Sequence, residues 1–390
     1  VPNLRFPEFK GEWKKKHLSE LVGDIKDRIS TSSLSVDNYV STENILQNFQ
    51  GVTLATSLPH NTNVTAFRKD DILFSNIRPY LKKIWYASYD GGCSTDVFVF
   101  RNSGMCSAMF LYHLIANDKF INYVMLGTKG TKMPRGDKQQ IIQYVVYLPS
   151  KLEQNKIATF LSLLDSRIEA QIKIIEDLKL LKKTMSQNIF SLKIRFKDEE
   201  GNVFSSWKLR KLSDVLIIQG GYAFKSSLFN QGTNKVIRIG DILPIIKLSN
   251  FSGIYSSETP NEKYIVRKND FVMALSGATF GKVGKIEDKG IAYINQRVAT
   301  FRTKQCLEFF YQLVQINNFK NYISSIPTAS AQPNISNDDI GNYKSYIPDV
   351  MEQTKIAGFL STIDNKIETE RAILDAYAKQ KQYLLANLLI

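Results

Sequence analysis

The sequence has few of the residues from which catalytic and metal sites are most often built. It contains three histidines and three cysteines in 390 residues, and none has the spacing of a metal-binding or nucleophile motif. An odd number of cysteines without a C-x-x-C pair also argues against a disulfide framework. No run of 18 or more apolar residues and no secretory signal pattern is present, so we expect a cytoplasmic protein that does not span a membrane. These absences predict a non-catalytic chain.

Two segments approach known motifs and then depart from them. Ser276–Gly284 resembles a phosphate-binding loop, but it is one residue short between the glycines and has Val283 where a Ser or Thr would bind magnesium. Asn76–Tyr80 resembles the Asn-Pro-Pro-Tyr motif of adenine methyltransferases, but two inserted residues interrupt it and no glycine-rich cofactor turn accompanies it. We therefore interpret residues 276–284 as a tight turn between strands.

The most prominent feature of the sequence is a long internal repeat. With a constant offset of 199 residues, 12 of the 22 positions from 148 to 169 are identical to their counterparts. The identity includes polar positions, such as Glu153 and Glu352, which the apolar spacing of a helix alone would not preserve. A duplicated unit of one domain plus one helix explains this, and it predicts a molecule with pseudo-twofold symmetry.

The repeat and the local patterns divide the chain into five segments. Short β-type runs separated by polar turns, followed by helical stretches at 108–125 and 307–323, predict α+β domains. Apolar residues then recur mostly at steps of three or four positions, from Ile157 to Ile189 and from Ile356 to Leu388. The segments are a first globular domain (1–150), a central long helix (151–192), a linker (193–206), a second globular domain (207–347) and a C-terminal long helix (348–390).

The narrow apolar stripes predict how the two helices pack. Each helix is on the order of 35 residues and roughly 50 Å long, which is too long for a core element of a small domain. We expect the stripes to pair as an antiparallel coiled coil that separates the two similar globular domains. In the alternative arrangement, each helix packs on its own domain.

The excess of positive charge lies on the globular segments. Lys and Arg outnumber Asp and Glu by 18 to 13 in residues 1–150 and by 18 to 10 in residues 206–347, whereas the counts are 10 to 8 in 151–205 and 5 to 6 in 348–390. Two basic domains joined by nearly neutral segments suit a polyanion that is contacted at two places, and nucleic acid is the foremost candidate. Charge alone is equally compatible with a basic protein that has no such partner.

These features together resemble the specificity subunits of type I restriction–modification systems. The resemblance covers the full chain and rests on the lead-in Leu4–Trp13, the strand at Asp70–Leu73 and the helix opening Glu-Gln-x-Lys-Ile-Ala-x-Phe-Leu-Ser-x-x-Asp, which occurs twice. The second lead-in retains Arg195 and Trp207 but has an acidic insert instead of a proline.

The resemblance implies a subunit that reads an asymmetric, two-part site in double-stranded DNA. Each globular domain would be a target-recognition domain for one half-site, and the helices would set the spacer and hold two methyltransferase subunits, with restriction and translocation subunits joining them. The resemblance also implies that the chain binds no cofactor itself, since S-adenosylmethionine, ATP and magnesium are expected on the partner subunits.

Candidate contact residues follow from turn chemistry and from the repeat. Basic residues in glycine-containing turns are expected to contact DNA, although each lysine is also compatible with a solvated surface charge. Polar residues that repeat at the helix openings are expected to face the methyltransferase, although helix capping would explain them equally well. The DNA candidates are Lys82, Lys83, Lys129, Lys132, Arg135, Lys225, Lys282, Lys285 and Arg297, and the partner candidates are Gln154, Lys156, Gln353 and Lys355.

Two other function classes stay open at this point. One is an enzyme with an unfamiliar site, which the purified chain alone would reveal when mixed with DNA and cofactor. The other is a stand-alone DNA-binding scaffold or regulator without enzymatic partners, which would not co-purify with a methyltransferase.

Overall fold

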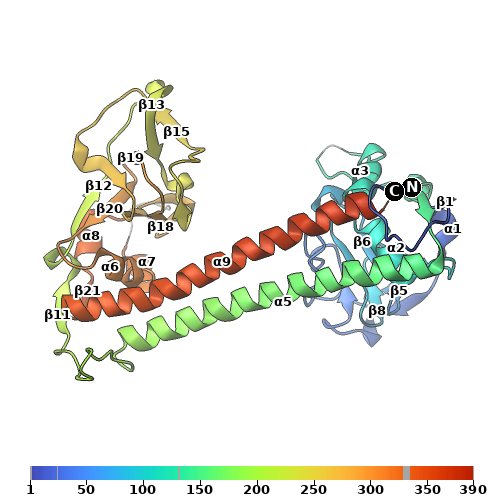
Figure 1. Ribbon diagram of the computed structural model, residues 1–390, viewed down its shortest axis with the longest axis horizontal. Helices are drawn as coiled ribbons and strands as arrows, with labels where there is room; N and C mark the ends of the chain where they lie inside the picture. Colours follow the sequence, from blue (N-terminus) through green and yellow to red (C-terminus); the bar gives the residue numbers. More distant parts are fainter. Residues whose placement is uncertain (1, 24, 131, 328–333, 390) are drawn as a thin grey trace. The chain divides into compact units, whose positions relative to one another are not determined.

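The computed structural model describes residues 2–23, 25–130, 132–327 and 334–389, and the chain forms two compact units (Figure 1). The first unit comprises residues 1–173 and 371–390, and the second comprises residues 174–370. Both long helices, α5 (Lys151–Phe190) and α9 (Val350–Leu388), therefore contribute one part to each unit. Their bounds agree with the expected helices at 151–192 and 348–390 to within two residues. Among the described residues, no helix is long and apolar enough to cross a membrane.

The first unit is built on two four-stranded sheets and one strand pair. The strand orders are β2-β9-β6-β7 and β3-β5-β8-β4, and β1 pairs with β10 immediately before α5 begins. All pairings are antiparallel except β4 with β8. The strands are β1 (Lys14–His17), β2 (Val22–Gly23), β3 (Arg28–Ser30), β4 (Tyr39–Val40), β5 (Asn63–Phe67), β6 (Ile72–Ser75), β7 (Ile84–Tyr86), β8 (Gly91–Cys93), β9 (Val97–Asn102) and β10 (Val145–Leu148), and the short helices are α1 (Leu18–Leu21), η1 (Thr31–Ser33), η2 (Pro79–Leu81), α2 (Ala108–Ile115), α3 (Asp118–Leu126) and α4 (Lys138–Ile141).

The second unit repeats this plan with one more strand. Its sheets have the orders β12-β20-β17-β18-β14 and β15-β13-β19-β16, and β11 pairs with β21 immediately before α9. The strands are β11 (Lys208–Lys211), β12 (Ile217–Gly220), β13 (Phe229–Ile237), β14 (Ile245–Ile246), β15 (Ile254–Ser256), β16 (Ile265–Arg267), β17 (Phe271–Ala274), β18 (Val283–Ile286), β19 (Ile291–Ile294), β20 (Val298–Arg302) and β21 (Lys344–Ile347), and the short helices are η3 (Leu212–Asp214), η4 (Ser226–Leu228), η5 (Ile239–Asp241), η6 (Glu262–Tyr264), η7 (Gly277–Thr279), α6 (Leu307–Leu313), α7 (Asn317–Ser325) and α8 (Asn337–Gly341).

Alternating side chains on the central strands enter separate cores on the two faces of the sheet in each domain. In β6, Phe74 enters the core beneath α2 and α3, whereas Leu73 points to the opposite face and packs with β8. In β17, Phe271 and Met273 pack under α6 and α7, whereas Val272 enters the other core. This period of two is what a strand buried on both faces requires. The α+β class predicted from the sequence is therefore confirmed in both domains.

One predicted helical stretch in each domain is in fact two helices. The expected helix at 108–125 ends at Ile115, and α3 starts again at Asp118 because the Asn117 side chain caps it by accepting from the Lys119 amide at 2.6 Å. The stretch at 307–323 divides in the same way into α6 and α7. Apolar periodicity alone did not reveal these breaks.

The long helices run antiparallel, as expected, and each of them also packs on domain cores. In the first unit, Ile157 near the start of α5 and Leu385 near the end of α9 belong to one core, and Asp165 forms an ion pair with Lys381. In the second unit, Ile189 near the end of α5 and Ile356 near the start of α9 share a core. Each long helix therefore pairs with the other helix and also packs on a domain. The two arrangements that the sequence left open occur together.

Candidate DNA interface and helix joints

A buried glutamate fixes the start of each long helix to the lead-in of its domain. Arg5 donates to both carboxylate oxygens of Glu153 at 2.7 Å, and Trp13 Nε1 donates at 3.3 Å. Arg195 bonds both oxygens of Glu352 at 2.9 Å in the second copy, where Trp207 Nε1 donates at 2.8 Å. Both glutamates are at least 99% buried, and these donors replace the water that each carboxylate would otherwise bind. The Arg and the Trp repeat in the sequence because this joint repeats.

The two glutamines at the helix openings do not face a partner, contrary to expectation. Gln154 and Gln353 are 3% and 0% exposed. Gln154 Oε1 accepts from the Ser107 amide at 2.8 Å, and its Nε2 donates to the Pro149 carbonyl at 2.9 Å. Gln353 accepts from the Cys306 amide and donates to the Pro348 carbonyl in the same way. Their repetition reflects a buried structural role within the chain.

The two repeated lysines, in contrast, lie at the surface. Lys156 is exposed, forms an ion pair with Glu8 and lies 5.0 Å from the centre of the Phe6 ring. Lys355 is half-buried, donates to the Lys197 carbonyl at 3.0 Å and lies 5.8 Å from the Phe204 ring. Both lysines attach the lead-in to the helix, and both remain at a surface that a partner can contact.

Three of the proposed DNA-contacting lysines are partly buried and have polar partners within the domain. Lys82 pairs with Asp118 at 2.6 Å, and Asp118 also accepts from Gln382 of α9. Lys83 donates to the Thr42 carbonyl at 2.5 Å, and burial lowers its pKa. Lys285 pairs with Glu308, which also accepts from Ser361 of α9 at 2.7 Å. The ammonium groups of these three lysines thus have partners within the domain, and their contact with DNA stays a prediction.

The remaining candidates are at loops and turns. Lys132 and Lys225 are exposed, and Lys282 is half-buried in the turn between β17 and β18. That turn contains η7 and leads directly into a strand, as expected for residues 276–284. Lys129 pairs with Asp137 at 2.8 Å. Arg135 and Arg297 lie at structurally equivalent loop clusters, one in each domain.

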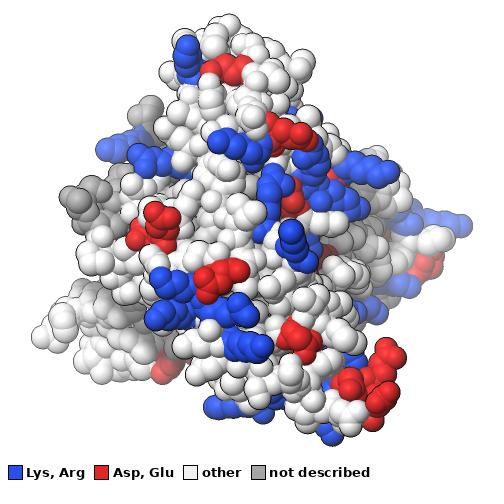
Figure 2. Space-filling model, turned by 90° about the vertical axis from the view of Figure 1, so that its left-hand side faces the viewer, with Lys and Arg blue, Asp and Glu red and all other residues white. Residues whose placement is uncertain are grey.

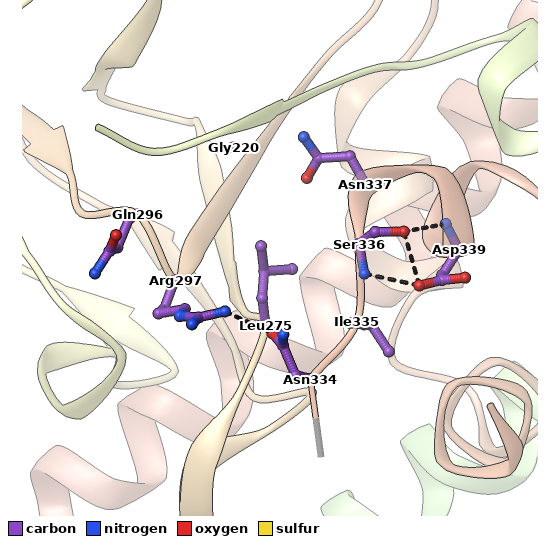
Figure 3. Close-up of a pocket in the computed structure, with 9 residues that line it drawn as sticks. All are labelled: Gly220, Leu275, Gln296, Arg297, Asn334, Ile335, Ser336, Asn337 and Asp339. Atoms are coloured by element: carbon purple, nitrogen blue, oxygen red, sulfur yellow. Dashed lines mark hydrogen bonds between the residues drawn. The ribbon is translucent and has the colours of Figure 1, made fainter. Parts of the chain in front are cut away.

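In the second domain, Arg297 lines a cavity of about 410 Å³ (Figure 3). Its Nη1 donates to Asn334 Oδ1 at 2.9 Å. Across the cavity, Ser336 and Asp339 hydrogen-bond each other, and Asn337 lies between them and Gly220 (Figure 3). The full lining is Gly220, Leu275, Gln296, Arg297, Asn334, Ile335, Ser336, Asn337 and Asp339.

The surface of the second unit has charges of both signs. Figure 2 shows several groups of lysine and arginine side chains on this face, with acidic residues between them. On this face, the basic side chains do not form a single continuous band.

The first domain has a pair at the place that corresponds to the Arg297–Asn334 pair of the second. There, Arg135 Nη2 lies 3.3 Å from Asp96 Oδ1. Sequence reasoning selected Arg135 and Arg297 but missed Asp96, Asn334 and the cavity around Asn334. The offset of 199 aligns Arg135 with Asn334, so the repeat itself contained the signal for one of them. The partners became visible only once the sheet register placed Asp96 and Arg297 in equivalent positions.

A protein family and a curated relative match most of the chain. The family model described as the type I restriction modification DNA specificity domain matches residues 10–179 and 205–376, which are the two copies of the repeat. The MjaVIII specificity subunit of a type I restriction enzyme from Methanocaldococcus jannaschii is 30% identical over 305 residues, which cover 74% of this chain and 71% of that protein.

Solved structures show the same fold at lower identity. The crystal structure of the type I restriction–modification S subunit from M. genitalium has a TM-score of 0.62 at 16% identity and covers 100% of this chain and 99% of its own. A chain from a structural study of complex assembly and conformational transition in the type I R-M system has a TM-score of 0.58 at 18% identity, with 98% of both chains covered.

Proposed function

Because the chain belongs to the type I restriction modification DNA specificity family, we propose a division of labour among its parts. It is the DNA sequence-recognition subunit of a type I restriction–modification system and is not itself an enzyme. Each globular domain reads one half of a bipartite site, and the helix pair sets the spacer between the halves. Two methyltransferase subunits dock at the two helix openings and bind S-adenosylmethionine, and the restriction subunits bind ATP and magnesium.

The duplicated joint is the observation that carries this proposal. Each domain is attached to its helix by the same Arg–Glu–Trp cluster, while the loops at the ends of the sheets differ. A repeated attachment suits repeated docking of one type of partner. Different loops on the same scaffold suit two different DNA sequences.

The helix openings also repeat an exposed apolar surface. Leu152 and Met351 are 75% and 68% exposed, and they are related by the offset of 199 residues. Phe160 and Phe359 repeat in the same way, at 40% and 36% exposure, and each makes an edge contact with a lead-in phenylalanine. Exposed apolar groups that recur on equivalent surfaces indicate a protein interface that is used twice.

The docking surface can be tested without disturbing the fold, since Leu152 and Met351 are highly exposed. Leu152→Glu or Met351→Glu should each remove one methyltransferase from the complex, and the double variant should remove both. Leu180→Glu, at 62% exposure farther along α5, is the matched control. The readout is the mass of the co-purified complex, and a double variant that still carries two methyltransferases would contradict this assignment.

The function as a whole is tested by sequencing the methylated adenines of cells with and without the gene. We expect a single bipartite motif to disappear with the gene. Loss of no motif, together with absence of a co-purifying methyltransferase, would favour a stand-alone DNA-binding protein.

The spacer role has a separate test in the helices. Four residues inserted into both α5 and α9, after Lys173 and after Glu370, add about 6 Å to each helix. This is close to two base-pair steps of 3.4 Å. The spacer should lengthen by one or two base pairs while both half-sites keep their sequence. A changed half-site sequence with an unchanged spacer would contradict the proposed role of the helices.

A further inference from the structure

The two domains hold a side-chain pair at the same place on the same backbone scaffold. The Asn76 amide donates to the Asp96 carbonyl in the first domain, and the Leu275 amide donates to the Arg297 carbonyl in the second. Isolated β-bridges join Ile77 to Arg135 and Ser276 to Asn334. The two hydrogen bonds make Asp96 equivalent to Arg297, and each of these residues immediately precedes a central strand. The two β-bridges make Arg135 equivalent to Asn334.

The arginine occupies opposite positions of this pair in the two domains. The first domain has an acid before β9 and an arginine on the facing loop, which lie 3.3 Å apart. The second has an arginine before β20 and an asparagine on the facing loop, joined by a hydrogen bond of 2.9 Å. Each domain therefore presents an arginine that is oriented by an acceptor, but from opposite sides of the cluster.

The chemistry of the cluster fits base edges better than phosphates. A phosphate offers acceptors and a negative charge, so its site is lined with donors and cations. Here Asp96 accompanies Arg135, and Asp339 lines the cavity together with Asn334 and Asn337. A mixed set of donors and acceptors is what the edges of bases in the major groove require.

Both side-chain pairs are exposed to solvent, and their backbones are held in position. Arg135 has 56% of its side chain exposed and Asp96 has 34%, while Arg297 and Asn334 are both exposed. Their backbones are fixed by hydrogen bonds to the central strands, so the side chains start from defined points. An arginine that is held by one acceptor keeps further N–H donors for a ligand.

We propose that these two pairs are specificity-determining residues for the two half-sites, an inference that rests on the function proposed above. Arg135 and Arg297 each bind the O6 and N7 acceptors of a guanine. Asp96 accepts from the N4 amino group of a cytosine, and Asn334 bonds the N6 and N7 positions of an adenine. The pair is Asp96 and Arg135 in the first domain but Arg297 and Asn334 in the second, and this difference is one reason why the two half-sites differ.

Isosteric exchange provides the sharpest test. Asn334→Asp keeps the side-chain shape and an acceptor for Arg297 but removes the amide donor that adenine needs. The variant is co-expressed with the methyltransferase, and relative methylation rates are measured on duplexes randomised in one half-site at a time. One position of the second half-site should change from adenine to cytosine by about ten- to a hundredfold, while the first half-site stays the same. Asp96→Asn should produce the opposite change in the first half-site.

Arginine variants complete the test. Arg297→Ala should relax selection of guanine at one position of the second half-site only. Arg267→Ala is the matched control, because Arg267 is an exposed arginine of the same domain that pairs with Glu262. Its half-site preferences should be unchanged.

Three results would overturn the inference. One is unchanged half-site preference in Asn334→Asp. Another is a uniform loss of methylation over all duplexes. The third is a salt slope reduced by about one in Arg297→Ala with unchanged preferences, which is the behaviour of a phosphate contact. These results differ from failure of the proposed function, in which the unaltered chain and its methyltransferase would show no bipartite preference.

Discussion

The joints that attach the two domains to their helices are nearly identical, whereas the loops at the ends of their sheets are not. Glu153 and Glu352 are both buried and both bind an arginine and a tryptophan. At the loops, Asp96 and Arg135 of one domain are replaced by Arg297 and Asn334 of the other. A duplicated domain thus retains the residues that attach it to its helix and varies those that we assign to reading DNA. The comparison predicts that substitutions at the joints or seams act on stability and assembly, while substitutions at the loops act on sequence preference.

Equivalent seam positions provide the largest expected effect. Leu164 and Ile363 are related by the repeat, and each is 8% exposed on the stripe of its long helix. Leu164→Asp should destabilise the first unit and Ile363→Asp the second, each by about 3–5 kcal/mol, because an unpaired carboxylate is buried. Hydrogen exchange measured for each unit separately would check this. Variants that exchange and melt like the parent would show that the stripe is not a buried seam.

Low pH should destabilise the first unit through His113, and this effect should be absent from the second unit, which has Gln312 at the equivalent position. Burial, with a smaller contribution from the Lys381 charge, lowers the pKa of His113 to about 3. Between pH 6.5 and 3 the unfolded chain therefore binds a proton that the folded chain does not. This contribution to stability is complete above pH 6.5 and is lost as the pH falls.

The first unit should accordingly lose roughly 3 kcal/mol of stability between pH 7 and pH 4 through this residue. His113→Gln should flatten the pH dependence of that unit only, as measured by urea unfolding followed by hydrogen exchange in each unit. The exposed His17→Gln is the control. Equal acid sensitivity of the first unit in His113→Gln and in the parent would refute this role.

The joints should differ in strength although their residues match. Trp207 is buried and donates to Glu352 at 2.8 Å, whereas Trp13 is half-buried and donates to Glu153 at 3.3 Å. Glu352→Gln should therefore lower the free energy of unfolding by about 2 kcal/mol, and Glu153→Gln should lower it by about 1 kcal/mol. Both values are modest because the arginine of each joint is partly exposed and can still bind water. Thermal melting of the two variants would measure this, and the reverse order would contradict the geometric argument.

The smallest expected effect separates open from paired lysines. Lys132→Gln and Lys225→Gln should each reduce the slope of log binding constant against log salt by about one, without changing the methylated motif. Lys82→Gln and Lys285→Gln should leave that slope unchanged, because these side chains pair with Asp118 and Glu308. Fluorescence anisotropy with a labelled duplex over a range of salt concentrations would supply the slopes. Equal slopes for all four variants would place the DNA-facing surface elsewhere.

The sequence was sufficient to predict the elements that obey a strong local pattern. The short β-type runs expected in each domain are present as strands, for example β6, β9 and β17. The long helices were equally clear, because their apolar stripes extend over about nine turns at 3.6 residues per turn. These features depend on periodicity, which is visible in a single sequence.

The roles of the repeated polar residues could not be read from the sequence alone. Gln154 is polar at the start of a helix, which is typical of an exposed residue, yet it is buried because the Ser107 amide and the Pro149 carbonyl satisfy its side chain. Lys285 seemed to lie in an open turn but pairs with Glu308, 23 residues away. Such tertiary partners are set by the packing of distant segments. The equivalence of Asp96 and Arg297 likewise required the sheet register.

The central claim is that each domain reads its own half-site independently. It is tested most directly by replacing residues 207–347 with a second copy of the corresponding first-domain residues, 13–148, and by sequencing the methylated adenines of cells that carry this chain. The account predicts a site that contains the first half-site twice and has lost the second. Retention of the original second half-site by this chain would contradict it.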